Sequence, residues 1–375
     1  MKKICVITGS RAEFGLLSDL LMRIDRDPDM DLRLVVTGGH LSAHHGATIS
    51  EIQDAGLRPS HTIDMGLTDD DRVEAILHAM GREQQGLADV LASDRPDLVL
   101  ILGDRYEILP AAVMAVMAGI PLAHIGGGEE TTGAVDNKIR HAVSQMADYH
   151  FVAAQVYEER LRHMGIAQDR IHFVGALGVE RVLTTVSRSL GQEVLESLGL
   201  TGDGPLFLVT YHPVTTNADE SKRGVAALLD ALATFETART VITGVNADSG
   251  GRQIDAQIKA FAKEHEASVR CVESLGAKRY LSVMAHAQAV VGNSSSGIIE
   301  APAMGVPTIN IGSRQGGRAR APSIIDCSPD RDAIVAALRQ GLDPTFRAGL
   351  DGMDIPFPGR DVARQIHETL KSILA

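Results

Sequence analysis

The chain has 375 residues, enough for two domains of ordinary size, and 44% of them are apolar, which is sufficient for buried cores. The formal net charge is -12, and aromatic residues make up only 3%, with no tryptophan. An acidic surface repels phosphate backbones and few rings are available to stack on bases, so the composition argues against nucleic acid as a partner.

Neither a secretion signal nor a membrane span is predicted. The apolar run near the N-terminus, "ICVI", has only four residues and indicates a first strand. The most apolar long run, "LPAAVMAVMAGIPLAHI", is interrupted by Gly119 and Pro121 and is too short to cross a bilayer. Three widely separated cysteines (Cys5, Cys271 and Cys327) form neither a disulfide framework nor a metal motif. We therefore expect a soluble, cytoplasmic protein that does not bind membranes.

Short β-rich apolar runs alternate with helical patterns along the whole chain. Runs that are continuous rather than alternating are typical of strands covered by helices on both faces. Strand–helix–strand repetition therefore predicts an α/β fold with parallel, doubly wound sheets. In chain order the predicted strands cover residues 3–8, 32–38, 97–104, 121–126, 149–154, 170–175, 206–212, 239–245, 289–294 and 307–312.

The pattern restarts after about residue 170, where a polar, Gly-rich stretch, "RSLGQEVLESLGLTGDGP", precedes a new strand. We place the boundary between residues 171 and 190. The sequence predicts an N-terminal Rossmann-like lobe over residues 1–175 and a C-terminal one over 176–357. An amphipathic helix over 358–375 is expected to pack back on the N-terminal lobe. Ligands of such sheets bind at the carboxyl ends of the strands, so we expect a central cleft between the lobes.

Charged side chains follow the strands of the N-terminal half. Asp104 and Arg105 come directly after one strand, and Glu129 follows the next one after three glycines. Asp136 opens the helical stretch "DNKIRHAVSQMA". Each has a structural alternative, because Asp104 and Arg105 could form an ion pair and Asp136 could cap a helix. Their common position at one edge of the sheet favours an active cleft.

The C-terminal half has two comparable places. His212 follows the strand "LFLVTY", and a core histidine that only makes structural hydrogen bonds is the alternative there. The stretch "GNSSSGIIE" (292–300) joins a strand to a helix start through small residues. Free backbone N–H groups, serine hydroxyls and the helix dipole make this stretch a candidate anion site, unless Ser294 is simply the N-cap of an ordinary helix. Glu300, one turn later, suits a sugar diol. A diphosphate and a ribose together indicate a nucleotide diphosphate.

The first strand-to-helix turn, "ITGSRAEFGLL", has neither G-x-G-x-x-G nor a G-K-[ST] ending. The chain therefore offers no obvious site for NAD, and the ligand is better explained as a nucleotide sugar used as substrate. Arg11 on this turn can reach the diphosphate as a bidentate donor. His40 and His44 have i, i+4 spacing, but no carboxylate stands at a matching distance in the sequence, so we predict no metal and no cofactor.

Several motifs resemble one known family. They are "SRAEFGLL", "TGGHLS", "LGDRYE", "HIGGGEETTGAVDNKIRHA", "YHPVT", "GNSSSGIIEAP" and "GSRQGGRARA", in the same order and spacing from Ile4 to about residue 370. The family is that of the hydrolysing UDP-N-acetylglucosamine 2-epimerases of sialic and legionaminic acid pathways, which have a GT-B fold. The non-hydrolysing epimerases carry G-T-R-P-E and H-R-R-E-N at places where this chain differs.

The resemblance implies a role for each matched residue. Asp104, Glu129 and Asp136 would be the catalytic carboxylates, and His212 is placed both with them and with the diphosphate. The residues expected to bind the nucleotide are Arg11, Arg105, Asn246, Ser294, Ser295, Gly297, Glu300 and Arg314. A UDP-sugar substrate, no cofactor, and a homodimer or homotetramer are implied as well.

Two positions depart from the family pattern. Gly126 fills a position where relatives carry His or Glu, and Asn137 stands where Asp or Glu is common. These departures bear on the sugar specificity more than on the reaction, because Asp104, Glu129 and Asp136 are all present.

The implied reaction eliminates UDP to give a 2-acetamidoglycal, which is then hydrated with inversion at C2. UDP-N-acetylglucosamine is the expected substrate, with UDP- or GDP-linked diacetylbacillosamine as the alternative within the family. A GT-B glycosyltransferase and a non-catalytic sugar-nucleotide sensor remain open as alternatives of other classes.

Overall fold

The computed structural model describes residues 1–70, 72–245 and 250–375, and the chain divides into two compact α/β units. The first unit comprises Met1–Glu129, Asp136–Leu177 and Pro358–Ala375. The second comprises Glu130–Val135 and Gly178–Phe357. The six residues between Glu129 and Asp136 thus belong to the second unit. Nothing in the sequence indicated that this short segment is part of the second unit.

The described residues of the first unit form a seven-stranded sheet in the order β3-β2-β1-β4-β5-β6-β7, in which every pair is parallel. This arrangement confirms the predicted doubly wound sheet. The predicted strands of this half are all present, and β3 is an additional one. The strands are β1 (Lys2–Thr8), β2 (Met30–Val36), β3 (His61–Thr62), β4 (Leu98–Leu102), β5 (Leu122–Ile125), β6 (Tyr149–Val152) and β7 (Ile171–Phe173).

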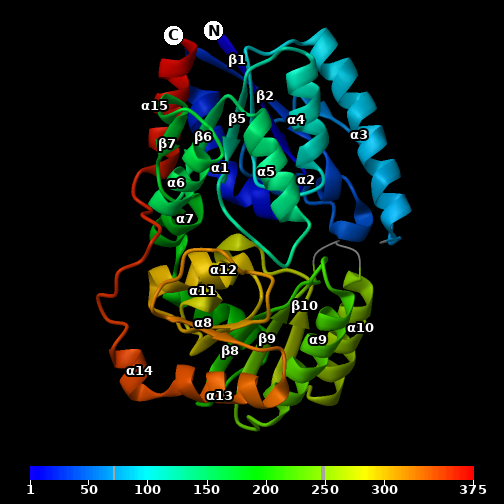
Figure 1. Ribbon diagram of the computed structural model, residues 1–375. Coiled ribbons are helices and arrows are strands. Elements are labelled where there is room, and N and C mark those ends of the chain that lie inside the picture. The colour runs from blue at the N-terminus through cyan, green and yellow to red at the C-terminus, as the bar shows by residue number, and fades with distance from the viewer. Residues whose placement is uncertain (71, 246–249) are drawn as a thin grey trace. The chain divides into compact units, whose positions relative to one another are not determined.

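Alternate residues of each strand face opposite layers of helices, as the pleat requires. On β1, Ile4 and Val6 join the core built with α1 and α15, whereas Cys5 and Ile7 join the core built with α3, α4 and α5. Figure 1 shows α3, α4 and α5 together on one side of this sheet. The helices are α1 (Arg11–Arg26), α2 (Ile49–Asp54), α3 (Val73–Ser93), α4 (Ile108–Met117), α5 (Asp136–Met146), α6 (Gln155–His163) and α15 (Val362–Leu374), with short 3-10 turns η1 (Gly38–His40), η2 (Ala43–His45) and η3 (Gln168–Arg170).

The C-terminal helix α15 packs on the first unit beside α1 (Figure 1). Its buried stripe includes Val362, Ile366 and Leu370, which join the same core as Leu17 and Leu21 of α1. At the edge of this contact His367 and Lys371 contact the carboxylate of Asp27 at 2.9 and 3.1 Å. The last eighteen residues therefore complete a face of the N-terminal sheet.

The second unit contains a six-stranded parallel sheet over its described residues, in the order β10-β9-β8-β11-β12-β13. β10 and β13 were not predicted. The strands are β8 (Leu206–Thr210), β9 (Arg239–Thr243), β10 (Val269–Val272), β11 (Ala289–Gly292), β12 (Thr308–Ile311) and β13 (Ile324–Cys327).

Helices cover both faces of this sheet as well. Phe207 and Val209 of β8 pack with α9, α10 and α13, and Leu206 and Leu208 pack with α7, α8 and α11. The helices are α7 (Leu177–Thr185), α8 (Arg188–Ser197), α9 (Ala218–Ala233), α10 (Gly251–Glu264), α11 (Ala277–Met284), α12 (Ser295–Ile299), η4 (Ala301–Met304), α13 (Arg331–Leu342) and α14 (Pro344–Ala348).

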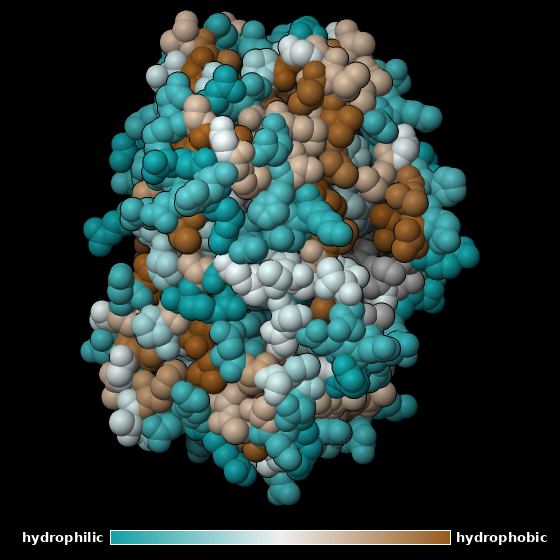
Figure 2. All heavy atoms as spheres, viewed as in Figure 1, coloured by the Kyte–Doolittle hydropathy of each residue, from teal (hydrophilic) through white to brown (hydrophobic). Residues whose placement is uncertain are grey.

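Hydrophobic residues reach the viewed surface in separate patches (Figure 2). On α3, Val73 and Leu77 are 57% and 59% exposed, and Met117 at the end of α4 is 79% exposed. Scattered apolar residues of this kind are usual on a protein surface and single out no interface. The homo-oligomer therefore stays a prediction. No helix among the described residues is both long and apolar enough to cross a membrane.

Candidate active site

Asp104 lies just past the carboxyl end of β4 and is held by a buried arginine. Gly103 adopts a φ of +89°, a conformation that glycine accepts without strain, and so turns the chain after the strand. The Asp104 carboxylate forms an ion pair with Arg140 of α5, whose side chain is only 2% exposed. The Asp104 side chain keeps 18% exposure, so it remains accessible. Asp104 thus has an ion-pair partner on α5, which the structural alternative of an Asp104–Arg105 pair did not include.

Arg105 contacts the carboxylate of Glu107. Its Nε lies 3.2 Å from Oε2 and its Nη2 3.2 Å from Oε1 of the Glu107 carboxylate, which is 2% exposed. The Glu107 side chain lies so close to Gly9 that a Cβ there would come within 2.9 Å of it. Glu107 therefore fixes Arg105 against the first turn.

Glu13, the acid of the first turn, is structural. Its Oε2 accepts a hydrogen bond from the Gly9 N–H at 2.8 Å, and the Ser10 hydroxyl caps α1 by accepting from the Glu13 N–H. Burial, and then the neighbouring Glu107, raise the pKa of Glu13 to about 7. Burial likewise raises the pKa of Glu83, whose carboxylate is fully buried nearby on α3. The acid of the "SRAE" turn therefore faces the core and is not a ligand candidate.

A stability prediction follows for Glu13. Because its pKa rises from 4.5 in the unfolded chain to about 7 in the fold, the folded state binds the proton more tightly between those values. The charge then costs stability above pH 7, and this cost disappears below pH 4.5. Glu13→Gln keeps an acceptor for the Gly9 N–H without the charge. We expect it to raise the free energy of unfolding by about 2–3 kcal/mol at pH 8 and to leave it unchanged at pH 4.

Urea unfolding followed by circular dichroism at both pH values measures this difference. Glu74→Gln is the matched control, since Glu74 also lies in the first turn of a helix but is exposed. A gain of the same size at pH 4 and pH 8 would contradict the assignment, because it would not depend on the charge.

The loop after β5 is shaped by His124 and three glycines. His124 is fully buried and its Nε2 lies 2.7 Å from the Gly103 carbonyl oxygen, so the neutral ring bridges the two strand ends. Burial lowers the pKa of His124 to about 3. Gly126 has a φ of +90°. A Cβ there would lie 3.9 Å from Glu129 Oε1, so the side chain of Glu129, 8% exposed, borders the position where this chain departs from its family.

Asp136 is the first residue of α5 and is half-buried. A carboxylate there is favoured by the positive end of the helix dipole. Arg140, one turn further on, pairs with Asp104, so α5 contributes to the placement of both carboxylates. Asp104 and Glu129 thus follow β4 and β5, and α5, which begins at Asp136, is joined to Asp104 through Arg140.

Arg11 is the first residue of α1 and is half-buried. The nearby His40 is fully buried, with Nε2 3.2 Å from the Thr8 hydroxyl and Nδ1 2.8 Å from the Thr48 hydroxyl. Burial lowers the pKa of His40 to about 4. Both ring nitrogens of His40 thus contact threonine hydroxyls, and this histidine is a neutral core residue.

In the second unit Asn293 fixes the backbone of His212. The His212 N–H donates to Asn293 Oδ1 at 2.7 Å, and Asn293 Nδ2 donates to the His212 carbonyl at 2.8 Å. Asn293 is fully buried just past β11, and His212, 7% exposed, lies just past β8. Two neighbouring strand ends are thereby locked together.

The serine loop begins a short helix. Ser294 is its N-cap and accepts from the Ser296 N–H at 3.4 Å, which is the structural alternative considered above. A hydroxyl that accepts in this way keeps its own proton for donation. The Ser296 hydroxyl lies 2.7 Å from that of Tyr280. Because α12 has only five residues, its dipole is small, so an anion bound here would depend mainly on the N–H groups and hydroxyls around Ser295.

Gly297, Glu300 and Arg314 lie around this loop. Gly297 packs closely on β12, where Thr308 donates to its carbonyl at 2.6 Å. Glu300 follows α12, and a Cβ on Gly178 would come within 2.6 Å of its Oε1. Arg314 is 8% exposed and its Nη1 donates to the Asn293 carbonyl at 3.2 Å. The second unit thus gathers its candidate residues around Asn293, with the exception of Asn246, which lies outside the described residues.

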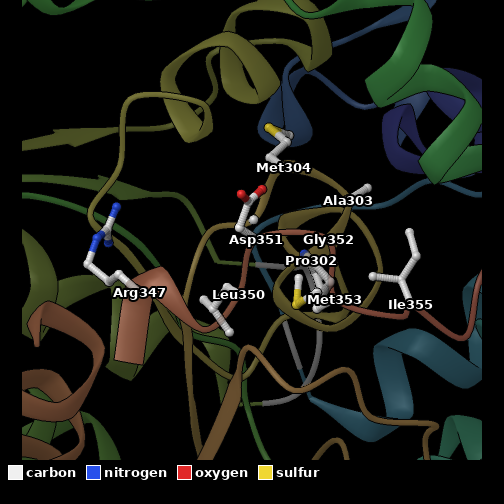
Figure 3. A pocket seen from close by; sticks show the side chains of 10 residues that line it. Pro302, Ala303, Met304, Arg347, Leu350, Asp351, Gly352, Met353 and Ile355 are labelled. Atoms are coloured by element: carbon white, nitrogen blue, oxygen red, sulfur yellow. The ribbon is translucent and has the colours of Figure 1, made fainter. Parts of the chain in front are cut away.

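One cavity of the second unit lies apart from these residues. A cavity of about 450 Å³ in the second unit is lined by η4 and by the segment 347–355, with Met304, Leu350 and Met353 among its side chains (Figure 3). Its described lining includes none of the candidate site residues. Over residues 1–70, 72–245 and 250–375, no group of three His, Cys, Asp or Glu side chains is placed to hold a metal ion.

Two residues of the site were missed in the sequence. Arg140 and Asn293 both stand inside quoted motifs, yet their roles depend on contacts with residues 36 and 81 positions away. Only the charge of Arg140 on the otherwise apolar side of a helix could have indicated burial. Asn293 stands at the end of a predicted strand, but nothing in the sequence indicates its contact with His212.

Residues 22–371 match the family model described as UDP-N-acetylglucosamine 2-epimerase. The chain is 36% identical to the GDP/UDP-N,N'-diacetylbacillosamine 2-epimerase (hydrolyzing) of Campylobacter jejuni, over 87% of this chain and 84% of the relative. It is 35% identical to the UDP-N,N'-diacetylbacillosamine 2-epimerase (hydrolyzing) of Legionella pneumophila, over 92% and 89%.

The fold has close counterparts among solved structures. The UDP-GlcNAc 2-epimerase of Neisseria meningitidis, solved bound to UDP-GlcNAc, superposes with a TM-score of 0.83 over 99% of this chain and all of that one, at 17% identity. The two parallel-sheet units thus have the GT-B-like arrangement of elements that the motifs implied.

Proposed function

The chain belongs to the UDP-N-acetylglucosamine 2-epimerase family, and from this premise we propose that it hydrolyses a UDP-linked 2-acetamido sugar with inversion at C2. In the simplest case UDP-N-acetylglucosamine and water give N-acetylmannosamine and UDP. The observation that carries the proposal is the similarity to two hydrolysing 2-epimerases over 87% and 92% of the chain.

We assign the nucleotide diphosphate to the residues around Asn293. Arg314 supplies a charge for the phosphates, and the Ser294 and Ser295 hydroxyls with the N–H groups of the loop add hydrogen bonds. Glu300 suits the ribose diol as an acceptor. Donors of this kind stabilise the charge that develops on UDP as it leaves. The remaining proposed contacts to the nucleotide come from Arg11, Arg105, His212, Asn246 and Gly297.

The carboxylates Asp104, Glu129 and Asp136 are assigned to proton transfer. One of them removes the C2 proton while the anomeric C–O bond breaks, which releases UDP and leaves a 2-acetamidoglycal. Water then adds at C1, and a second acid delivers a proton to C2 from the other face. Two faces of the ring require two groups, which accounts for several acids around one sugar. The imidazole ring of His212 is assigned to assist this proton transfer.

The route moves protons and not hydride, so no nicotinamide is required, and we expect the activity to survive EDTA. A homodimer or homotetramer in the cytoplasm remains part of the proposal. A GT-B glycosyltransferase is distinguished by a simple assay, because it would release little free sugar from the nucleotide sugar and water without an acceptor.

Two sugars compete as substrate. The relatives from C. jejuni and L. pneumophila are named for diacetylbacillosamine, whereas one from N. meningitidis, 32% identical over 93% of this chain, is named for N-acetylglucosamine. Gly126 borders Glu129 at the candidate sugar site and leaves space there. Measuring kcat/KM for the two UDP-sugars side by side decides between them.

The elimination route predicts the origin of one hydrogen. In D2O the released sugar should carry deuterium at C2, because the proton removed in elimination exchanges before another is delivered from solvent. Proton NMR and mass spectrometry of the product measure the incorporation. Retention of the original C2 hydrogen would contradict elimination and would indicate direct displacement at C1.

A further inference from the structure

Arg140 is a deeply buried charge beside the carboxyl end of β4. It lies in the second turn of α5, and its side chain is 2% exposed. A guanidinium stays protonated in proteins, so a buried one must be matched by acceptors nearby. Here its Nη2 contacts Asp104 Oδ2, and its Nη1 donates to Asn137 Oδ1 at 3.3 Å.

These two contacts link separate elements. Asp104 belongs to the turn after β4, and Asn137 to the first turn of α5, next to Asp136. One rigid, planar group therefore sets the position of the β4 turn relative to the start of α5. A guanidinium against a carboxylate also favours the ionised form of that carboxylate.

We propose that Arg140 is a positioning residue that holds the Asp104 carboxylate ionised and in one orientation at the carboxyl end of β4. Arg140 acts through Asp104 and through Asn137. The catalytic meaning of this contact rests on the proposed function, because only that function makes Asp104 a proton-transfer group.

Asn137 contributes to the same positioning of Asp104. Its amide oxygen gives Arg140 a neutral acceptor, so the positive charge is not shared with a carboxylate at this position. An aspartate there would place a second negative charge beside the same guanidinium and close to Asp104. Like charges disfavour ionisation of each other, so Asn137→Asp should weaken the hold of Arg140 on Asp104. The helix N-terminus accepts the new charge, which keeps this variant folded.

The first experiment is independent of activity. Aspartate labelled with ¹³C at the carboxyl carbon is incorporated, the Asp104 signal is assigned with Asp104→Asn, and its titration is followed by NMR. Arg140→Met should raise the midpoint by about 1–3 pH units, and Asn137→Asp should raise it by less. Arg140→Lys, which keeps the charge, should stay close to the wild type. An unchanged midpoint in both Arg140→Met and Asn137→Asp would overturn the proposal.

The second experiment uses turnover on the UDP-sugar. Arg140→Met should lower kcat roughly 10²–10³-fold with a small change in KM, and the acidic limb of its pH profile should move up with the NMR midpoint. Arg140→Lys should recover part of kcat. In the Asp104→Asn background Arg140→Met should cause no further loss of kcat, since both changes remove the same interaction between Arg140 and Asp104. If the fold-losses in kcat of the two single variants multiplied in the double variant, Arg140 would not act through Asp104.

Arg33→Met serves as the control. Arg33 lies on β2 in the same unit and pairs with Asp31 at 2.8 Å and Asp94 at 3.1 Å. Its loss should leave kcat and the Asp104 titration unchanged. A wild-type protein that releases no sugar would refute the proposed function, whereas the NMR titration would still decide the effect of Arg140 on Asp104.

Discussion

Asp104→Asn, Glu129→Gln and Asp136→Asn are each expected to lower turnover by roughly 10²–10⁴, the usual worth of a positioned acid or base. Each amide keeps the shape of the side chain but removes its negative charge and its ability to exchange a proton. The affinity for UDP should survive, because the proposed phosphate contacts come from other residues. Steady-state kinetics and calorimetry with UDP measure the two effects separately.

The three variants should differ in stability. Asp104→Asn removes the carboxylate from the ion pair with the buried guanidinium of Arg140, and losing one partner of a buried ion pair costs up to about 3–5 kcal/mol. Asp136 is half-buried at a helix start, so Asp136→Asn should fold almost as well as the wild type. Asp136→Asn is therefore the cleaner test of a catalytic role.

Asp97→Asn is the matched control for these variants. Asp97 lies at the opposite end of β4 from Asp104, where it accepts from the Lys3 N–H at 2.7 Å. The Asp97→Asn variant should retain full turnover. A variant that stalls after elimination should accumulate the glycal and so identify the acid that serves hydration. Full activity in all three amide variants would exclude the assigned proton-transfer groups.

The strands that sequence analysis missed share one property. β3, β10 and β13 are outermost in their sheets, and none of them is a continuous apolar run: "HT" is polar, whereas "VRCV" and "IIDC" mix polar and apolar residues. Central strands of a doubly wound sheet are buried on both faces and give continuous apolar runs, which were predicted. An edge strand is covered on fewer sides, so it need not be a continuous apolar run. β7, the other edge strand of the first sheet, was predicted because its sequence "IHF" is mostly apolar.

The candidate site was predictable as far as topology determines it. Residues directly after buried strands must gather at one edge of a parallel sheet, and this rule identified Asp104, Glu129 and His212. The same rule gives the position of Asn293, directly after β11, but not its hydrogen bonds to His212. Arg140 could not be found in this way, because it lies on a helix and its partner Asp104 is far along the chain. Glu13 had a local signal, since Ser10-x-x-Glu13 is a capping-box pattern that indicates a structural acid.

Three buried histidines should make the first unit sensitive to acid. His40, His124 and His150 are fully buried, and burial lowers their pKa values from 6.5 to about 4, 3 and 4. The unfolded chain therefore binds more protons than the fold as pH falls below 6.5, so their contribution is complete above pH 6.5 and is lost towards pH 3–4. By pH 4.5 each should cost about 2.5 kcal/mol, or about 8 kcal/mol together. Protonation of Glu13 acts in the opposite direction but recovers only about 3 kcal/mol.

The histidines and Glu13 change the stability of the same unit in opposite directions as pH falls. The test therefore compares variants at two pH values and does not rely on the pH dependence of wild-type stability alone. His150→Phe keeps a buried ring beside His124, whose ring centre is 6.4 Å away, and removes one titrating group. From pH 8 to pH 4.5 it should lose about 2.5 kcal/mol less unfolding free energy than the wild type, measured by urea titration. His163→Phe, at an exposed position on α6, should follow the wild type. If His150→Phe also followed the wild type, a buried neutral His150 would be ruled out as a source of acid sensitivity, because only a group that binds its proton on unfolding produces this pH-dependent difference.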